Sequence, residues 1–423
     1  MIKRFYNALF SLTLALALTG CSNEDFLTVS DEVKAKQELE EQAKTVLTFS
    51  MGGSDLISKA STDYRAWHEG DPTTFGAYGI YNQATSIPED FFNNQLVERE
   101  EDEGVFQWSR WKYDPLKYWA DYTSYNTFDF FAYMPQQETD SSEPESPRNG
   151  AKIELEKVTG VGSGTGIDTL KATLSFVVTL KDADTIVAVL DGINDGENNP
   201  LICNVPVHKT KVGEVINFQM DQTLTGFSLN FILGEDMSNI RDFVIKEVRV
   251  TGAQNTIPVG GVVSRTYKYP LKSGSAWTAG DITWSDITYN NDREKATEIP
   301  FVDHSTATSP TDIYDVVNKT LRIGYSEQGM ERQWGAYFYA IPSAEFQPTI
   351  TVKYDVIVKD EDGNDIETRE NIVSLIQFSD SNFPSYTAAG SIGKVNPITI
   401  KIIPAHLYVL ADADQRFGYL EVE

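Results

Sequence analysis

Apolar and polar residues alternate along most of the chain that follows position 45. Such alternation is typical of half-buried β-strands, because successive side chains of a strand point to opposite faces of a sheet. Each of the clearest runs places its apolar side chains on one face of its own strand. These runs are Leu47, Phe49 and Met51; Phe128, Phe130, Ala132 and Met134; Leu174, Phe176, Val178 and Leu180; Phe227, Leu229, Phe231 and Leu233; Trp334, Ala336, Phe338 and Ala340; and Ile398, Ile400 and Ile402. We therefore expect an all-β chain whose core contains these side chains.

Turn signals separate the predicted strands. In DEDGND, Asp362 and Gly363 supply the backbone freedom that a tight hairpin needs between the runs 349–359 and 366–375. Helical periodicity is scarce and predicts only short turns near 114–122, 181–190 and 309–317. Many short strands with turns between them are typical of β-sandwiches.

The length of the chain favours two such sandwiches. A chain of 423 residues is too long for one hydrophobic core. The stretch 266–281 contains Pro270, Gly274 and Gly280 and predicts an interdomain connection. We expect an N-terminal β-sandwich domain over 45–268 and a C-terminal one over 269–423.

The first twenty residues have the composition of an export signal. Lys3 and Arg4 precede an apolar stretch of about ten residues, well below the roughly 20 needed to span a bilayer as a helix. The sequence LTGC at 18–21 fits the lipobox of bacterial lipoproteins, so residues 1–20 are expected to be removed and Cys21 to carry lipid. An ordinary signal peptide with a chance cysteine is the alternative. Residues 21–44 are polar and acidic and are expected to form a tether.

The charge of the chain limits its partners. The sequence has 35 basic and 62 acidic side chains; loss of two basic ones with the signal leaves 33, a formal charge of −29. Such a surface repels nucleic acid and anionic lipid headgroups, so no nucleic-acid partner is expected. Cys203 is the only other cysteine, so an internal disulfide is not expected in the exported chain.

The sequence contains no motif that predicts catalysis, a metal or another cofactor. The histidines are isolated from one another and from cysteines, which argues against a zinc site; they are His68, His208, His304 and His406. The acidic run 360–365 resembles a calcium loop, but its glycine falls too early and the bidentate glutamate is missing, so a hairpin turn is favoured. A pair of facing carboxylates, as in glycosidases, stays open at this point because 62 acidic residues place some pairs close by chance. We expect a non-enzymatic protein.

Aromatic residues are dense between 108 and 125. Trp108, Trp111 and Trp119 could form an exposed platform for sugars, whereas side chains of this size more often fill a core or attach a loop to a sheet. Both interpretations stay open, with core packing favoured.

The same segment, WSRWKYDPLKYWADYTSYNTFDFFAYMPQ, resembles a segment of the fimbrillins, the two-domain lipoprotein pilins and adhesins of Bacteroidales type V pili. Other stretches resemble the family in the same order from about 45 to 404, including TVLTFSMGGSDLISKAS, AWHEGDPTTFGAY and YFYAIP. The chain departs from the family pattern at Ala120, where proline is usual, and at Met220 or Asp221, where histidine is usual.

This resemblance implies two transthyretin-like, Greek-key domains and assembly by strand exchange. A protease would cut after Lys59 or Arg65, and the first strand, with Leu47, Phe49 and Met51, would leave a groove that a strand of another pilin subunit fills. The segment 407–423 is the expected donor. The resemblance also implies a host protein or glycan ligand, and a place in a fimbrium on the outer membrane. SNED at 22–25 resembles the acidic signals that send Bacteroidales lipoproteins to the outer face of that membrane. The alternative is a non-polymerising surface lipoprotein that binds glycans through exposed aromatics.

Overall fold

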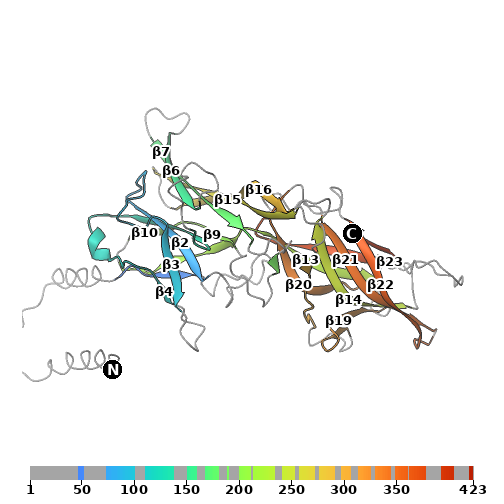
Figure 1. Cartoon of the computed structure of the whole chain (residues 1–423). Helices are drawn as coiled ribbons and strands as arrows, with labels where there is room; N and C mark the ends of the chain where they lie inside the picture. Colours follow the sequence, from blue (N-terminus) through green and yellow to red (C-terminus); the bar gives the residue numbers. More distant parts are fainter. Residues whose placement is uncertain are drawn as a thin grey trace, which may run out of the picture.

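The structure is a computed structural model, and it confirms a fold built almost entirely of β-strands. It describes residues 46–51, 73–100, 110–137, 150–159, 167–180, 188–189, 200–210, 213–233, 241–252, 257–271, 276–290, 297–305, 313–324, 329–343, 348–360, 362–377, 392–403 and 419–422. Within these ranges the only helical element is a 3-10 turn, η2, over Trp119–Tyr122, at one of the positions where a short turn is predicted. Figure 1 shows the sheets in two groups along the molecule.

The first group is built around one sheet of seven strands. Its path is β12-β9-β5-β2-β3-β4, and β10 also pairs with β5. The strands are β2 (Thr74–Tyr81), β3 (Gln95–Glu100), β4 (Arg110–Lys112), β5 (Phe128–Met134), β9 (Leu201–Cys203), β10 (Val207–Lys209) and β12 (Met220–Gln222).

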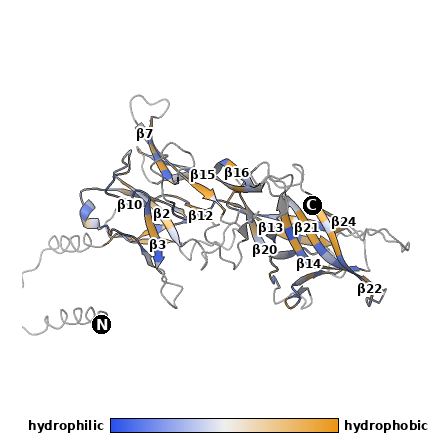
Figure 2. Ribbon diagram, in the orientation of Figure 1, coloured by the Kyte–Doolittle hydropathy of each residue, from blue (hydrophilic) through white to orange (hydrophobic). Residues whose placement is uncertain are grey.

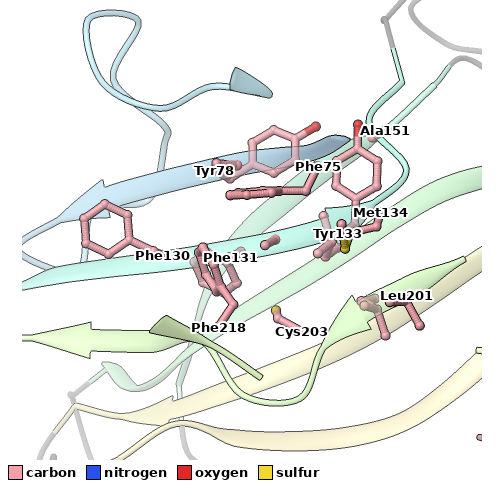
Figure 3. Close-up of a cluster of buried hydrophobic side chains, with 14 of the residues drawn as sticks. Phe75, Tyr78, Phe130, Phe131, Tyr133, Met134, Ala151, Leu201, Cys203 and Phe218 are labelled. Atoms are coloured by element: carbon pink, nitrogen blue, oxygen red, sulfur yellow. The ribbon is translucent and has the colours of Figure 1, made fainter. Parts of the chain in front are cut away.

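Two further layers cover this sheet. One is the antiparallel sheet β16-β15-β7-β6, made of β6 (Lys152–Thr159), β7 (Ile167–Thr179), β15 (Ile257–Pro270) and β16 (Thr278–Asn290). The other contains the parallel pair β1 (Phe49–Met51) and β11 (Ile216–Phe218). Side chains from β2, β5, β9 and β11 meet in the resulting core (Figure 3).

Strand β5 lies between the two layers and is buried on both faces. Phe130 contacts Phe49 on one side, with 6.4 Å between ring centroids. On the other side Phe131 contacts Trp277 at 5.3 Å and Tyr133 contacts Phe176 at 4.9 Å. The residues predicted to be buried are buried, but the expectation of an exposed second face was wrong for this strand, because a layer packs on each side of it.

The second group consists of two facing sheets. One has the order β24-β23-β13-β20-β8, and the other has the order β18-β19-β14-β21-β22 with β17 on β14. The strands are β8 (Ala188–Val189), β13 (Thr225–Leu233), β14 (Arg241–Gly252), β17 (Thr297–Glu298), β18 (Tyr314–Asp315), β19 (Thr320–Ile323), β20 (Arg332–Ala340), β21 (Pro348–Lys359), β22 (Asp365–Gln377), β23 (Val395–Ile403) and β24 (Tyr419–Val422).

Each group surrounds its own hydrophobic core, and apolar residues follow the strands of both (Figure 2). The second core contains the predicted apolar faces of 227–233 and 398–402, together with Trp334, Phe338 and Ala340. Strand β20 contributes side chains to both cores. In β20, Phe338 and Ala340 belong to the second core, whereas Tyr339 and, directly after the strand, Ile341 belong to the first.

The stretch 266–281, predicted to be an interdomain connection, is built differently where it is described. Its residues lie in β15 and β16, which pair with each other, and Tyr267 and Trp277 belong to the first core. The hairpin predicted at DEDGND is present between β21 and β22, with Gly363 at a φ of 83°. The domain boundaries at 44/45 and 268/269 stay predictions.

Candidate functional site

The first strand, β1, is held by few main-chain contacts. Among the described residues it pairs with β11 at three positions, in parallel, with Phe49 opposite Ile216. The amide of Ile216 donates a hydrogen bond of 2.8 Å to the carbonyl of Thr48. On the opposite edge, Val46 forms a single bridge with Tyr118.

Burial of alternate side chains holds β1 more firmly than its ladder does. Leu47, Phe49 and Met51 are buried, whereas Thr48 is exposed and Ser50 half-buried. The three residues predicted to share the inner face of the first strand therefore do share it. Their pattern follows from the period of two along a strand.

The ring of Phe49 lies in a pocket of aromatic side chains. Five rings have centroids between 5.1 and 6.4 Å from its own, and four of them meet it edge to face; the neighbours are Phe75, Phe92, Tyr113, Phe130 and Phe218. They come from β2, β5, β11 and the segments after β2 and β4, so the pocket is assembled from residues distant in sequence. We call the site formed by this pocket and the buried flanks of Leu47 and Met51 the β1 groove.

The segment 113–118 closes over the N-terminal end of β1. The hydroxyl of Tyr113 donates a hydrogen bond of 2.8 Å to the carbonyl of Leu47, and the amide of Leu47 donates one of 2.9 Å to the carbonyl of Lys117. Burial raises the pKa of Tyr113 to about 12, so its hydroxyl keeps its proton. Segment 113–118 thus binds both main-chain groups of one residue, and we call it the clasp.

The clasp is itself anchored to the first core. The ammonium group of Lys117 donates to the carbonyl of Asp90 at 2.9 Å and lies over the ring of Phe92, 5.6 Å from its centroid. The hydroxyl of Tyr122 donates to the same carbonyl at 2.7 Å. The clasp therefore has anchoring contacts that do not involve β1.

Several predicted site residues lie outside the described residues. These are Cys21, the cleavage candidates Lys59 and Arg65, and Trp108. Most of the expected donor segment 407–423 also lies outside them. Of this segment the structure places β24, which pairs antiparallel with β23 at the edge of its sheet.

The predicted aromatic platform is not assembled where its members are described. Trp119 is buried and meets Phe128 edge to face at 5.2 Å. Trp111 is half-buried and packs against Phe75 at 5.0 Å. The core-packing interpretation therefore describes Trp119, because η2 turns its ring into the first core.

Buried polar groups form two networks that tie layers together. The carboxylate of Asp129 accepts hydrogen bonds of 2.7 Å from the indole of Trp277 and 3.3 Å from the amide of Gln83, and lies 2.7 Å from Nδ1 of His208. In the other network, the hydroxyl of Tyr267 donates to the carbonyl of Cys203 at 2.6 Å. Burial raises the pKa of the Cys203 thiol to about 11, which keeps it in its unreactive thiol form.

Neither network resembles a catalytic or metal centre. In the part of the chain that the structure describes, no three His, Cys, Asp or Glu side chains gather closely enough to hold a metal ion. None of the described helices has the length and hydropathy needed to cross a membrane. The β1 groove is therefore the strongest candidate for a functional site.

Comparison with known proteins finds likeness to solved fimbrial and cell adhesion proteins of Bacteroides and Parabacteroides at low identity. No family model and no curated protein sequence matches the chain. Among solved structures, a fimbrial protein from Bacteroides vulgatus matches with 14% identity and a TM-score of 0.38, covering 89% of this chain and 98% of the other. A proposed cell adhesion protein from Bacteroides ovatus matches with 10% identity and a TM-score of 0.36, covering 89% and 95%.

A third neighbour, a proposed cell adhesion protein from Parabacteroides distasonis, matches with 12% identity and a TM-score of 0.31, covering 89% of this chain and 97% of the other. All three TM-scores lie below 0.5, so these neighbours say nothing of the function of this chain.

The local sequence pattern does not predict the clasp. Tyr113 and Leu47 are 66 positions apart, and nothing in their local patterns links them. The cis peptide bond between Asp114 and Pro115 lies in the clasp, and the DP dipeptide was interpreted only as the start of a helical turn.

Proposed function

We propose that this chain is a structural subunit or adhesin of a surface fimbrium that assembles by exchanging its first strand. The observation that carries the proposal is β1 itself. It is a short strand with three ladder partners among the described residues, and its inner side chains fill an aromatic groove. Main-chain pairing with alternate side-chain pockets is the basis of β-augmentation, in which an added strand of another chain completes a sheet.

Cleavage between β1 and β2 would make β1 separable from the rest of the chain. Lys59 and Arg65 lie in this connection and supply the basic residue that a trypsin-like protease requires. After the cut, only the contacts of the β1 groove and the clasp would retain the fragment. A strand of a neighbouring subunit, present at high local concentration, could then replace it.

The segment 407–423 is the proposed donor. Its strand β24 occupies a sheet edge and pairs with β23 alone among the described strands. A terminal edge strand can leave its sheet without breaking a second ladder. The sequence resemblance to fimbrillins implies the same role for this segment.

Lipid on Cys21 would hold the unassembled subunit at the outer membrane. The LTGC sequence and the polar tether 21–44 support this anchor. We expect the wild-type chain to partition with membranes and a Cys21→Ala variant to become soluble in the periplasm. Fractionation of cells that express each form is the measurement, and an unchanged membrane fraction for the variant would refute the anchor.

Strand exchange is tested by limited trypsin digestion of the purified chain. We expect mass spectrometry to find cleavage after Lys59 or Arg65, and size-exclusion chromatography to show new multimers. A Ser50→Cys, Asn217→Cys variant provides the matched control, because these residues are direct partners in the β1–β11 pair. When oxidised, this variant should be cut but remain monomeric, and reduction should restore assembly. Multimers that form equally well from the oxidised variant would exclude exchange of β1.

A further inference from the structure

The β1 groove and the clasp carry information about the strand that can fill the site. This information rests on the groups that contact β1 now, and it deepens the proposed function by defining the partner strand. The main-chain contacts determine the direction in which a strand can bind, and the side-chain contacts determine which residues the strand should carry.

The direction of the bound strand follows from the two clasp groups that face Leu47. The carbonyl of Lys117 can only accept a hydrogen bond, and it receives the amide of Leu47 at 2.9 Å. The hydroxyl of Tyr113 donates to the carbonyl of the same residue at 2.8 Å. The amide of Lys117 approaches the Tyr113 oxygen at 3.4 Å, which occupies its acceptor side and favours donation toward the strand.

A strand bound in the opposite direction would exchange the positions of its amide and carbonyl. Its carbonyl would then face the carbonyl of Lys117. The hydroxyl of Tyr113, 3.3 Å from the Lys117 carbonyl, can donate to that carbonyl, but the carbonyl of the strand would have no donor. A buried acceptor without a partner is costly, because it has lost its water without gaining a hydrogen bond. The clasp therefore discriminates between the two directions in a way that alternating side chains alone do not.

Sequence preference follows from the pocket around Phe49. Five rings surround this side chain, and Phe218 is stacked with it at 5.9 Å. The flanking positions of Leu47 and Met51 are also buried, whereas Thr48 is exposed. The pocket fits a planar ring at the central position and large apolar side chains two residues before and after it.

We infer that the β1 groove accepts an extended strand in one direction only, parallel to β11, with an aromatic residue in the Phe49 pocket and its main chain fixed by Tyr113 and Lys117. Tyr113 acts here as a positioning residue that sets direction and register. The preferred strand thus has the pattern apolar, any, aromatic, any, apolar. Residues 47–51 have this pattern and no five residues within 407–423 do, so a donor from 407–423 should bind more weakly than β1.

A binding assay on the full chain tests this inference without requiring cleavage. A Phe49→Ala variant weakens the resident β1, so that a labelled peptide of the sequence of residues 45–51 can compete for the groove. We expect fluorescence anisotropy to show binding of this peptide. Direction is tested by disulfide formation with Asn217→Cys in the same background. A peptide with cysteine at the position of Ser50, the direct partner of Asn217, should form the disulfide at least about tenfold faster than a peptide with cysteine at the position of Thr48, which would take that place in a strand bound in reverse. A peptide with alanine in place of its phenylalanine should bind about 100-fold more weakly.

The role of Tyr113 has a matched control in Tyr314, whose hydroxyl donates to the carbonyl of Gln333 at 2.9 Å in the second core, away from β1. In the Phe49→Ala background, Tyr113→Phe should weaken binding of the peptide by about 2- to 10-fold and reduce the difference in rate between the two cysteine peptides. Tyr314→Phe should change neither.

The inference is overturned if the two cysteine peptides form the disulfide at equal rates, if the peptide of residues 45–51 does not bind, or if the two tyrosine variants behave alike. Hydrogen exchange of the otherwise unaltered chain adds a second readout. There, Tyr113→Phe should speed exchange of the Leu47 amide by about 2- to 10-fold, and Tyr314→Phe should not. Because no cut or multimer is needed, these results are independent of whether strand exchange occurs.

Discussion

Replacing Phe49 by alanine should release β1 without unfolding the rest of the first core. The side chain is 6% exposed and contacts five rings. Phenylalanine-to-alanine changes in cores cost about 3 to 5 kcal/mol, and each aromatic pair contributes about 0.5 to 1.5 kcal/mol beyond buried area. We expect the docking free energy of β1 to fall by about 3 to 5 kcal/mol, which is a factor of at least about 100 in the docking equilibrium.

Native-state hydrogen exchange measures this change at individual amides. In the Phe49→Ala variant, the amides of β1 and the facing amides of β11 should lose protection by that factor, while those of β5 should change little. Thr48→Ala is the control, because Thr48 lies in the same segment with its side chain exposed. Equal loss of protection in β5 would show that β1 is an inseparable part of the core, and would refute the reasoning behind strand exchange.

Three further predictions concern the core and its polar network. Trp119→Ala should lower the free energy of unfolding by about 3 to 5 kcal/mol in chemical denaturation. Any saccharide binding that calorimetry detects should be the same for this variant and the wild type. Gly226→Ala should cost about 1 to 3 kcal/mol, because its new Cβ would lie 2.7 Å from a ring carbon of Tyr339; a melting temperature equal to wild type would contradict this packing. The hydrogen bond with Asp129 raises the pKa of His208 above its usual 6.5, against the opposing effect of burial. The charged form therefore stabilises the fold below about pH 6.5, and this contribution is lost as pH rises through the raised pKa. The difference in melting temperature between wild type and His208→Gln should shrink from pH 5.5 to 8.5, and a constant difference would argue against the pair.

Local pattern was enough to predict most strands, because a half-buried strand records its inner face at every second residue. The faces containing Phe227 and Ile400 are correct for this reason. Strand β5 shows the limit of the method: Phe131 and Tyr133 are as apolar as their neighbours, and only the layer that packs above them explains their burial. The connection predicted around Pro270 illustrates a second limit, since glycine and proline also occur within and beside the long strands β15 and β16.

The candidate site was also predictable only in part. Alternation predicted that Leu47, Phe49 and Met51 share one face, and the structure agrees. The clasp could not be predicted, because a hydrogen bond between Tyr113 and Leu47 depends on how distant segments meet. Trp119 could not be assigned by its residue type, since a large ring suits both a core and a sugar platform, and only its position in η2 decides between them.

Strand β20 has a mechanical consequence for any filament made of such subunits. Phe338 and Tyr339 are adjacent, yet one is packed in the second core and the other in the first. Turning one half of the molecule against the other would pull at least one of these rings from its packing. Tension along a fibre should therefore not bend the subunit between its two cores, and bending should concentrate at the contacts between neighbouring subunits.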